Sequence, residues 1–366
     1  MLDTVDTTAR HQRRVSSSFD VEIAAVATAV PRNVVTQDEM KSRAREAYPQ
    51  FAHIDTLYSN TGVETRYFCE AKEWYLTPHT WEERTEAFQR HALDLLERVT
   101  LDAVDKAGLR LDEIDAVVVN TITGLAVPSL DARLMNRLPF APHTERLPIF
   151  GIGCGGGVAG LARATRLAQT MPGGNVLFLT VDLCTLCLRI NDPNMAMFVS
   201  AALFGDGAAA VVLRNTGGGK TGAGGHGRVV AMGEHFWRDT ERIMGWDIKN
   251  DGFGIVLSPQ LPSLMQERFG GALDGFLDRN GLKREDFDGY ILHPGGGKIL
   301  DVADKILNLP KDALKPSRET LRNHGNMSSA TALFVLKYAL EAGQKGRHLM
   351  AAFGPGFSAY FVVLDL

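Results

Sequence analysis

The chain of 366 residues is long enough for two domain-sized halves, and its composition, with 45% hydrophobic and 22% charged residues, is ordinary for a globular protein. A formal net charge of −4 gives no reason to expect a nucleic-acid partner, and no run of about 18 apolar residues predicts a membrane span. Four cysteines do not make a disulfide framework in a chain of this size, which indicates a reducing compartment, so we expect a cytoplasmic protein.

Strand and helix patterns alternate along the chain. Residues 1–18 are polar and lack the apolar stretch of a signal peptide, so we expect a flexible N-terminal tail. Amphipathic patterns predict helices, most clearly over 85–107 and 258–280. Strands are predicted at residues 21–27, 115–120, 147–151, 175–181, 208–213, 229–232, 289–292, 348–353 and 359–364. This alternation predicts an α/β architecture with buried sheets.

A glycine-rich segment divides the chain. Residues 215–228 contain seven glycines in fourteen positions between two predicted strands, which favours a flexible connection. We therefore expect an N-terminal half over residues 19–214, which carries the candidate nucleophile described below, and a C-terminal half over residues 229–366.

The two halves contain a related segment. Residues 108–120 and 281–293 both read as a glycine that ends a helix, an acidic turn and a buried strand, at an offset of 173 residues. Three of the thirteen aligned residues are identical. The same offset relates Cys154 to Met327, so a duplicated α/β unit would bring Cys154, His293 and the turn around Met327 to equivalent ends of the two halves.

Cys154 lies in a glycine-rich turn, Gly-Ile-Gly-Cys-Gly-Gly-Gly, between a predicted strand and a predicted helix. A thiol in the first turn of a helix lies near unpaired backbone N–H groups and the positive end of the helix dipole, which both favour the thiolate. Cys154 is therefore a candidate nucleophile. The alternative is a small buried residue in a tight turn, since free cysteines are often buried and inert.

The same turn has a second interpretation as a nucleotide-binding loop. Residues 151–156 match G-x-G-x-x-G, and Asp182 ends a predicted strand 26 residues after Gly156, where an acid can bind a ribose hydroxyl. This pattern would indicate a nicotinamide-dependent oxidoreductase. The match is weak because four of the six positions are glycine, and it leaves Cys154 without a role.

Two further motifs place polar side chains at predicted strand-to-helix turns. His293 lies in Leu-His-Pro-Gly-Gly-Gly-Lys, where an imidazole can pair with a thiolate or donate to an oxyanion, and His324 is its nearest rival. Asn326 lies in Gly-Asn-Met-Ser-Ser, where its amide can donate to a thioester carbonyl or an enolate. Each also has a structural alternative, a buried histidine or a helix cap, but together with Cys154 they form a specific set.

The order of these motifs resembles the chalcone and stilbene synthase family, the type III polyketide synthases. The resemblance also rests on Phe204-Gly-Asp-Gly-Ala-Ala-Ala210 and the terminal Phe353-Gly-Pro-Gly356. Within the family, the cysteine turn and Met244-Gly-Trp-Asp247 resemble bacterial alkylpyrone and alkylresorcinol synthases. A related alternative is a ketoacyl-ACP synthase III, which shares the Cys-His-Asn order but depends on a carrier protein.

The resemblance implies a five-layered αβαβα thiolase fold of two duplicated halves, and a homodimer with one active site per subunit. It implies acyl-CoA starters and malonyl-CoA as substrates, without cofactor or metal. Cys154 would attack the starter thioester and hold the growing chain, while His293 keeps the thiolate ionised. His293 and Asn326 would stabilise the enolate formed by decarboxylation of malonyl-CoA. The implied product is an alkylpyrone, an alkylresorcinol or a related phenolic.

The resemblance also assigns residues to the cavity. Phe204 corresponds to a gating aromatic beside the cysteine, and Trp246 and Ile255 fall where the family sets cavity volume. Val127 stands where some relatives have a methionine that reaches into the partner's cavity. The cavity wall would also contain the segment 182–189.

Within that segment, Cys184 and Cys187 form a Cys-x-x-Cys pair, but a zinc site needs about four ligands and no second pair exists, so we expect no metal. Plant relatives bind CoA phosphates with a basic cluster ahead of an Arg-Tyr pair, and this chain lacks that cluster. Lys298, Gly296 and Arg43 are the substitutes that we predict for CoA binding.

Overall fold

The computed structural model describes residues 20–50, 54–189, 191, 193–218 and 225–366. The predicted tail and part of the predicted connection at 215–228 lie outside the described residues. Nine strands form the main sheet: β1 (Val21–Ala29), β4 (Ala116–Thr121), β5 (Glu145–Phe150), β6 (Asn175–Leu183), β7 (Asp206–Asn215), β8 (Arg228–Phe236), β11 (Gly289–Leu292), β12 (Arg347–Gly354) and β13 (Ser358–Asp365). They coincide with the nine predicted strands, which confirms those predictions.

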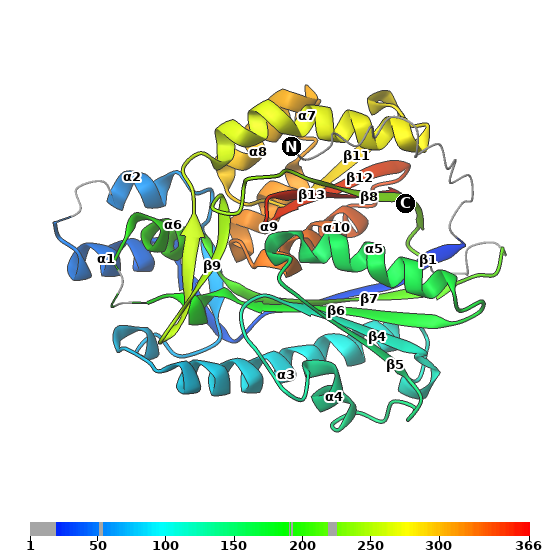
Figure 1. The fold of residues 1–366 in the computed structure, drawn as a ribbon, viewed down its shortest axis with the longest axis horizontal. Helices are drawn as coiled ribbons and strands as arrows, with labels where there is room; N and C mark the ends of the chain where they lie inside the picture. The colour runs from blue at the N-terminus through cyan, green and yellow to red at the C-terminus, as the bar shows by residue number, and fades with distance from the viewer. Residues whose placement is uncertain (1–19, 51–53, 190, 192, 219–224) are drawn as a thin grey trace, which may run out of the picture.

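The main sheet is folded into two layers. Its strand order is β11-β12-β13-β8-β1-β7-β6-β4-β5, and the layers meet where Glu22 of β1 pairs with Arg228 of β8. The longer helices are α3 (Trp81–Lys106), α5 (Gly156–Gln169), α7 (Leu261–Asn280), α8 (Gly297–Leu307), α9 (Lys315–His324) and α10 (Thr331–Glu341). Figure 1 shows α5 and α10 between the layers, α3 outside the first layer and α7 and α8 outside the second. This five-layered αβαβα arrangement confirms the predicted fold class.

The predicted duplication is visible in the topology. In the first layer β4 runs parallel to β6, β6 antiparallel to β7, and β7 antiparallel to β1. In the second layer β11, β12, β13 and β8 repeat these directions in the same order. The helices also correspond, because α3 and α7 precede β4 and β11, while α5 and α10 precede β6 and β12.

Local sequence signals explain where these elements begin and how closely they pack. Thr80 and Glu83 form a capping box at the start of α3, with the Thr80 N–H donating to the Glu83 carboxylate at 2.8 Å. Helix α7 ends at Gly281, whose φ of 66° suits glycine. A Cβ at Gly157 in α5 would lie 2.2 Å from the carbonyl oxygen of Ser329, so glycine lets the two halves touch here.

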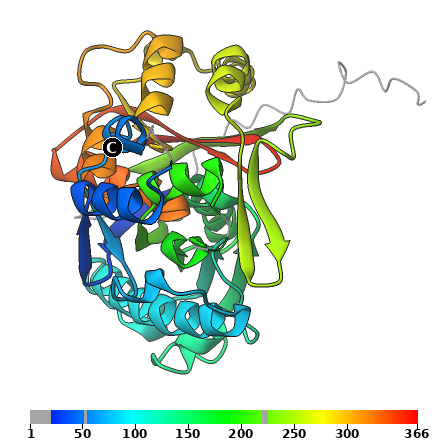
Figure 2. The ribbon, with the colours of Figure 1, turned by 90° about the vertical axis from the view of Figure 1, so that its left-hand side faces the viewer.

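Smaller elements that the sequence patterns did not predict complete the fold. They are β2 (Asn33–Thr36), α1 (Gln37–Ala47), α2 (Ile54–Ser59), β3 (Thr65–Phe68), α4 (Leu130–Met135), α6 (Met195–Leu203), β9 (Met244–Lys249) and β10 (Gly252–Leu257). Figure 2 shows the β9–β10 hairpin, in yellow-green, extending along one side of the molecule. No helix in the described part of the chain is long and apolar enough to cross a membrane.

Candidate active site

Cys154 lies in a short 3-10 turn, Gly153–Gly155, directly ahead of α5. The turn packs beneath the C-terminal Phe-Gly-Pro-Gly motif: Gly153 has a φ of 57°, and a Cβ there would lie 2.5 Å from the Pro355 ring. Glycine is therefore required for both the turn and its contact. The thiol is buried at this position, at the end of the helix that lies between the two sheets.

The structure brings the three predicted catalytic residues together. Cys154, His293 and Asn326 line one cavity of about 40 Å³, and Phe204 lines it too. His293 follows β11 and Asn326 precedes α10, so both belong to the C-terminal half. A hydrogen bond orients the Asn326 carboxamide, because its oxygen accepts from the Ser328 N–H at 2.9 Å.

Burial dominates the electrostatics of this cavity. It raises the pKa of the Cys154 thiol to about 12, and hydrogen bonds from Ser328 and Asn326 offset only part of this. Burial also lowers the pKa of His293 to about 4. The expected low pKa of the thiol is therefore wrong for this structure, because desolvation outweighs the helix terminus. The arrangement favours a neutral thiol beside a neutral imidazole.

The His293 ring is free to act on a substrate. Among the described residues, neither of its ring nitrogens has a hydrogen-bond partner, although the side chain is buried. A buried imidazole without partners is unusual, since such groups are normally satisfied by protein or water. The rival His324 is different: its Nε2 lies 3.2 Å from the Tyr338 hydroxyl and its ring stacks on Tyr67.

A second cavity of about 50 Å³ lies on another side of Cys154, and it contains four residues predicted for the cavity wall: Phe204, Cys184, Trp246 and Ile255. Trp246 and Ile255 face each other across the β9–β10 hairpin. The Trp246 indole donates to the Ile122 carbonyl oxygen at 2.9 Å, which fixes the ring across the space beside the thiol.

Three predicted site residues lie elsewhere. Cys187 lines a separate small cavity with Arg84 and Phe253, because the 3-10 turn Cys184–Cys187 directs its two thiols to different sides. Val127 is 92% exposed, so within one protomer it lies on the surface and not in a cavity. Arg43 lies in α1 and is not among the described residues that line the large cavity described next.

A large apolar cavity adjoins the site. It has a volume of about 950 Å³ and shares Leu203, Leu257 and Leu261 with the cavity at Cys154. Two predicted CoA-binding residues, Gly296 and Lys298, line it at the start of α8. Its other walls come from apolar side chains of α2 and α6, including Ile54, Leu57, Met195, Phe198 and Val199.

Two further polar residues influence the thiol: Ser328, which was quoted only as part of its motif, and Asp182, which was expected only as part of the cavity-wall segment or as a ribose-binding acid. Ser328 lines the second cavity with a φ of 49°, which is rare for a residue other than glycine. Asp182 is fully buried, and its oxygens accept from the N–H groups of Ile122 at 2.8 Å and Ser329 at 2.9 Å. Ser328 belongs to the quoted Gly-Asn-Met-Ser-Ser motif, which was the available signal.

These contacts rule against the nucleotide-binding interpretation. The Asp182 carboxylate is occupied by protein donors and is inaccessible to a ribose hydroxyl. A Cβ at Gly156 would lie 2.4 Å from the Asn120 amide, so the glycine serves packing within the protein. In the described ranges no group of three or more His, Cys, Asp or Glu side chains could hold a metal ion.

A thiol, an imidazole and an amide at one cavity of a thiolase-like fold define a condensing acyltransferase. The family model for the N-terminal domain of chalcone and stilbene synthases matches residues 8–216, and the model for their C-terminal domain matches residues 228–365. The chain therefore belongs to the chalcone and stilbene synthase family and is a type III polyketide synthase, which condenses malonyl-CoA units. The oxidoreductase and ketoacyl-ACP synthase alternatives are wrong.

Known relatives are similar in sequence to this chain along nearly its whole length. A 1,3,6,8-tetrahydroxynaphthalene synthase of Streptomyces peucetius subsp. caesius is 36% identical over 99% of this chain and 97% of its own length. A phloroglucinol synthase of Pseudomonas fluorescens is 30% identical over 91% and 95%. The crystal structure of 1,3,6,8-tetrahydroxynaphthalene synthase from Streptomyces coelicolor A3(2) matches with a TM-score of 0.88 and 31% identity, covering 94% of this chain and 99% of that one. The predicted family is confirmed, while the finer resemblance to alkylpyrone and alkylresorcinol synthases stays a prediction.

Proposed function

We propose that this type III polyketide synthase loads an apolar acyl-CoA starter on Cys154, extends it with malonyl-CoA and cyclises the product to an alkylpyrone, an alkylresorcinol or a related phenolic. The observation that supports this proposal is the apolar cavity of about 950 Å³ that adjoins the cavity at Cys154. An apolar wall of this size suits an alkyl chain, because burial of each CH₂ group contributes about 0.8 kcal/mol.

The loading step follows from the neutral state of the pair. His293 accepts the Cys154 proton as the sulfur attacks the thioester carbonyl, and the imidazolium then protonates the departing CoA thiolate. Burial lowers the pKa of His293 to about 4, so the ring is unprotonated at neutral pH and its nitrogen is free to take the thiol proton as the sulfur–carbon bond forms.

The extension step uses the C-terminal half. Malonyl-CoA loses carbon dioxide, and the negative charge that develops on the thioester oxygen is stabilised by hydrogen bonds from His293 and Asn326. The enolate carbon attacks the acyl group on Cys154, and the cysteine sulfur leaves. The apolar side chains around Phe204 and Leu257 exclude water, which favours loss of the carboxylate.

A second candidate is a shorter aromatic polyketide made without a long alkyl starter. Two observations favour it: the cavities directly at Cys154 are only about 40 and 50 Å³, and Trp246 closes one of them. The relatives named for tetrahydroxynaphthalene and phloroglucinol also make aromatic products by name. In this case the large cavity would hold the pantetheine arm of CoA.

A starter panel distinguishes the two candidates. Purified wild type and Cys154→Ala are incubated with labelled malonyl-CoA and acyl-CoA thioesters of increasing chain length, and the products are analysed by mass spectrometry. The first candidate predicts that kcat/KM rises with chain length and that the label enters alkylated pyrones or resorcinols. A product made equally well from malonyl-CoA alone would contradict it and support the second candidate.

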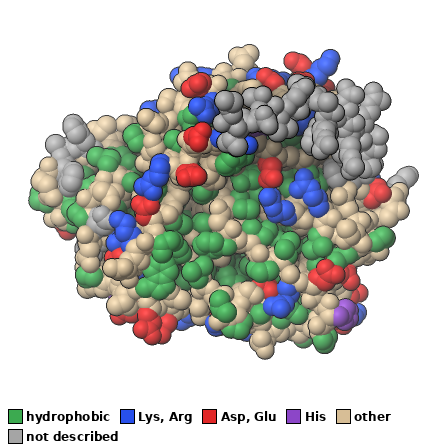
Figure 3. Space-filling model, viewed as in Figure 1, with side chains coloured by type: hydrophobic (Ala, Val, Ile, Leu, Met, Phe, Trp, Pro, Cys, Tyr) green, Lys and Arg blue, Asp and Glu red, His purple; other side chains and the backbone are tan. Residues whose placement is uncertain are grey.

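We also propose a homodimer. Strand β5 is an edge of the main sheet and carries exposed Leu147 and Phe150, while Leu125 and Val127 are exposed in the loop before α4. Figure 3 shows hydrophobic side chains gathered on the part of this face where Figure 1 places β5 and α4. Apolar groups on an open edge strand favour pairing with a second chain. Analytical ultracentrifugation should give the mass of a dimer, and Phe150→Glu should shift it to a monomer.

A further inference from the structure

A fully buried carboxylate lies behind the cavity wall and has no role in the chemistry described above. Asp206 is the first residue of β7, two positions after Phe204, and its side chain is inaccessible to solvent. It does not line either cavity at Cys154 among the residues described for them. Taking a carboxylate out of water costs free energy unless hydrogen bonds replace the lost hydration, so this group requires an explanation.

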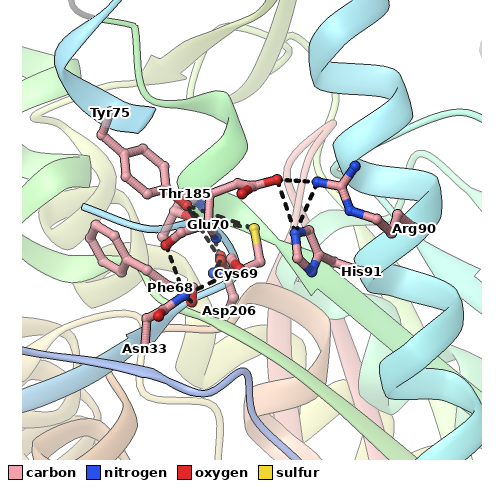
Figure 4. Close-up of polar contacts among 9 residues, drawn as sticks. All are labelled: Asn33, Phe68, Cys69, Glu70, Tyr75, Arg90, His91, Thr185 and Asp206. Carbon is pink, nitrogen blue, oxygen red and sulfur yellow. Dashed lines mark hydrogen bonds and ion pairs between the residues drawn. The ribbon is translucent and has the colours of Figure 1, made fainter. Parts of the chain in front are cut away.

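Three donors converge on Asp206. Its Oδ1 accepts from the Thr185 N–H at 2.8 Å, and its Oδ2 accepts from the Thr185 hydroxyl at 2.5 Å and the Cys69 N–H at 2.8 Å. Thr185 follows Cys184 directly, and Cys69 follows the end of β3. Figure 4 shows Cys69 and Thr185 close to Asp206, with Tyr75 beside Thr185. The carboxylate thus joins three separate segments at one point.

The hydrogen bonds form a directed chain. The Glu70 N–H donates to the Tyr75 hydroxyl at 3.3 Å, and the Tyr75 hydroxyl lies 2.7 Å from the Thr185 hydroxyl. Because the Thr185 hydroxyl uses its proton to donate to Asp206, Tyr75 is the donor to Thr185, and each of these protons has one acceptor. Such a chain is directional and cooperative, so it holds Thr185 in a single orientation.

Phe204 is held from its other side by a second buried charge. The Arg66 guanidinium on β3 is inaccessible to solvent and donates through Nη1 to the carbonyl oxygens of Ala201 at 2.6 Å and Phe204 at 3.4 Å. These carbonyls lie at the C-terminal end of α6, where a positive charge is favourable. The backbone around Phe204 is therefore held on both sides. Arg66 binds the end of α6 that leads into Phe204, and Asp206 anchors the start of β7 that follows it.

The cluster itself is not a second reaction centre. Cys69 is buried, and burial raises the pKa of its thiol well above its usual range, so this sulfur is a poor nucleophile. Its neighbours are the hydroxyls of Tyr75 at 3.7 Å and Thr185 at 3.9 Å. The cluster instead fixes the positions of Cys184 and Phe204, which both line the space beside Cys154.

We propose that Asp206 is a positioning residue for the condensation, which fixes Cys184 and Phe204 against the Cys154 thioester and thereby sets how many extensions the growing chain undergoes before release. The inference rests on the proposed function. A loosened wall would misplace the acyl chain relative to the enolate, and misplacement by about 1 Å can cost about a hundredfold in rate. Decarboxylation would be affected less, because it needs the hydrogen bonds of His293 and Asn326 and an apolar wall, but no alignment with an acyl chain on Cys154.

The test compares condensation with decarboxylation in isosteric variants. Asp206→Asn presents an amide NH₂ to at least one of the three donors, and Thr185→Val removes the hydroxyl while keeping the shape. Both should lower the ratio of polyketide formed to carbon dioxide released by about tenfold or more, and shift the products toward early-released short chains. A loss of folded protein alone would lower both readouts equally and leave the ratio unchanged.

Two controls make the outcome decisive. Thr185→Ser keeps the hydroxyl and should restore the wild-type ratio. Thr100→Val makes the same isosteric change at a buried α3 hydroxyl that has no hydrogen-bond partner among the described residues, and it should change nothing. If Asp206→Asn does not fold, the comparison of Thr185→Val with Thr185→Ser tests the inference. Wild-type product lengths and ratios in folded Asp206→Asn and Thr185→Val would overturn the inference, whereas an inactive wild type would instead contradict the proposed function.

Discussion

The two halves place different chemistry on equivalent turns. In the N-terminal half the turn ahead of α5 carries the Cys154 thiol, and in the C-terminal half the turn ahead of α10 carries Asn326. At the end of β11 stands His293, whereas its aligned position in the other half is Asn120, a buried side chain that donates to the Thr180 hydroxyl at 3.2 Å. In the proposed function, one half thus holds the nucleophile and the other holds the groups that stabilise the enolate.

This difference shows how a duplicated scaffold produces a two-substrate site. Equivalent strand ends meet between the sheets, because α5 and α10 lie side by side there and Gly157 lets α5 contact the Ser329 carbonyl. The common framework brings the turns together, and single side chains that differ between the halves give each turn its own chemistry. The proposed function assigns the acyl chain to one half and the activation of malonyl-CoA to the other, and mutations should separate the two activities.

Cys154→Ala should give the largest effect. It removes the acyl carrier but leaves His293 and Asn326 in place, so we expect polyketide formation to fall at least about 10³-fold while decarboxylation of malonyl-CoA continues. Release of labelled carbon dioxide and product mass measure the two activities. Cys187→Ala, in a separate cavity, is the matched control and should keep both. Equal loss of both activities in Cys154→Ala would contradict the division between halves.

Asn326→Ala tests the other half. Without this donor the enolate loses one hydrogen bond, so decarboxylation and condensation should both fall about 10²-fold. Alkylation of Cys154 by iodoacetamide should continue, because the thiol remains. Asn323→Ala is the control, since Asn323 donates to the Tyr338 hydroxyl outside the cavity. The assignment fails if Asn326→Ala loses condensation but decarboxylates at the wild-type rate.

The reactivity of the thiol with pH gives a third, smaller effect. Only the thiolate is alkylated, and burial raises the pKa of Cys154 to about 12. Since the thiolate fraction rises with pH below the pKa, the rate of alkylation should increase about tenfold per pH unit from about pH 6 to pH 9. Cys154→Ala supplies the blank. A plateau that begins near neutral pH would show that the helix terminus and His293 hold a thiolate after all.

The fold was largely predictable because its strands are continuous apolar runs, most of which are buried. All nine strands of the main sheet carry apolar runs, and the two glycine-marked helix ends made the duplication visible. The β9–β10 hairpin was missed because β9 is only partly buried and has β10 as its sole partner in a two-stranded sheet. Without a buried face, its sequence lacks the periodicity that predicts a strand.

The site residues that belong to short sequence motifs could be predicted, whereas the residues whose placement depends on tertiary packing could not. Cys154, His293 and Asn326 stand in glycine turns that are visible in the sequence, and they share a cavity. The direction of Cys187 and the exposure of Val127 depend on how a turn is oriented in three dimensions. The high pKa of the thiol has the same origin, because burial by distant segments outweighs the local helix effect.

The contact between the halves offers the last prediction. In Gly157→Ala the new methyl group would lie 2.2 Å from the Ser329 carbonyl oxygen, and backbone on both sides leaves little room to move, so we expect a loss of about 1–3 kcal/mol in the free energy of unfolding. Gly271→Ala in α7 is the control: its Cβ meets no atom within 4 Å, so helix propensity should stabilise the protein by up to about 1 kcal/mol. Urea denaturation measures both.

Because Ser329 follows the turn that carries Asn326, Gly157→Ala should also lower decarboxylation. A variant that is destabilised yet decarboxylates at the wild-type rate would show that the interface holds the halves together without positioning the amide.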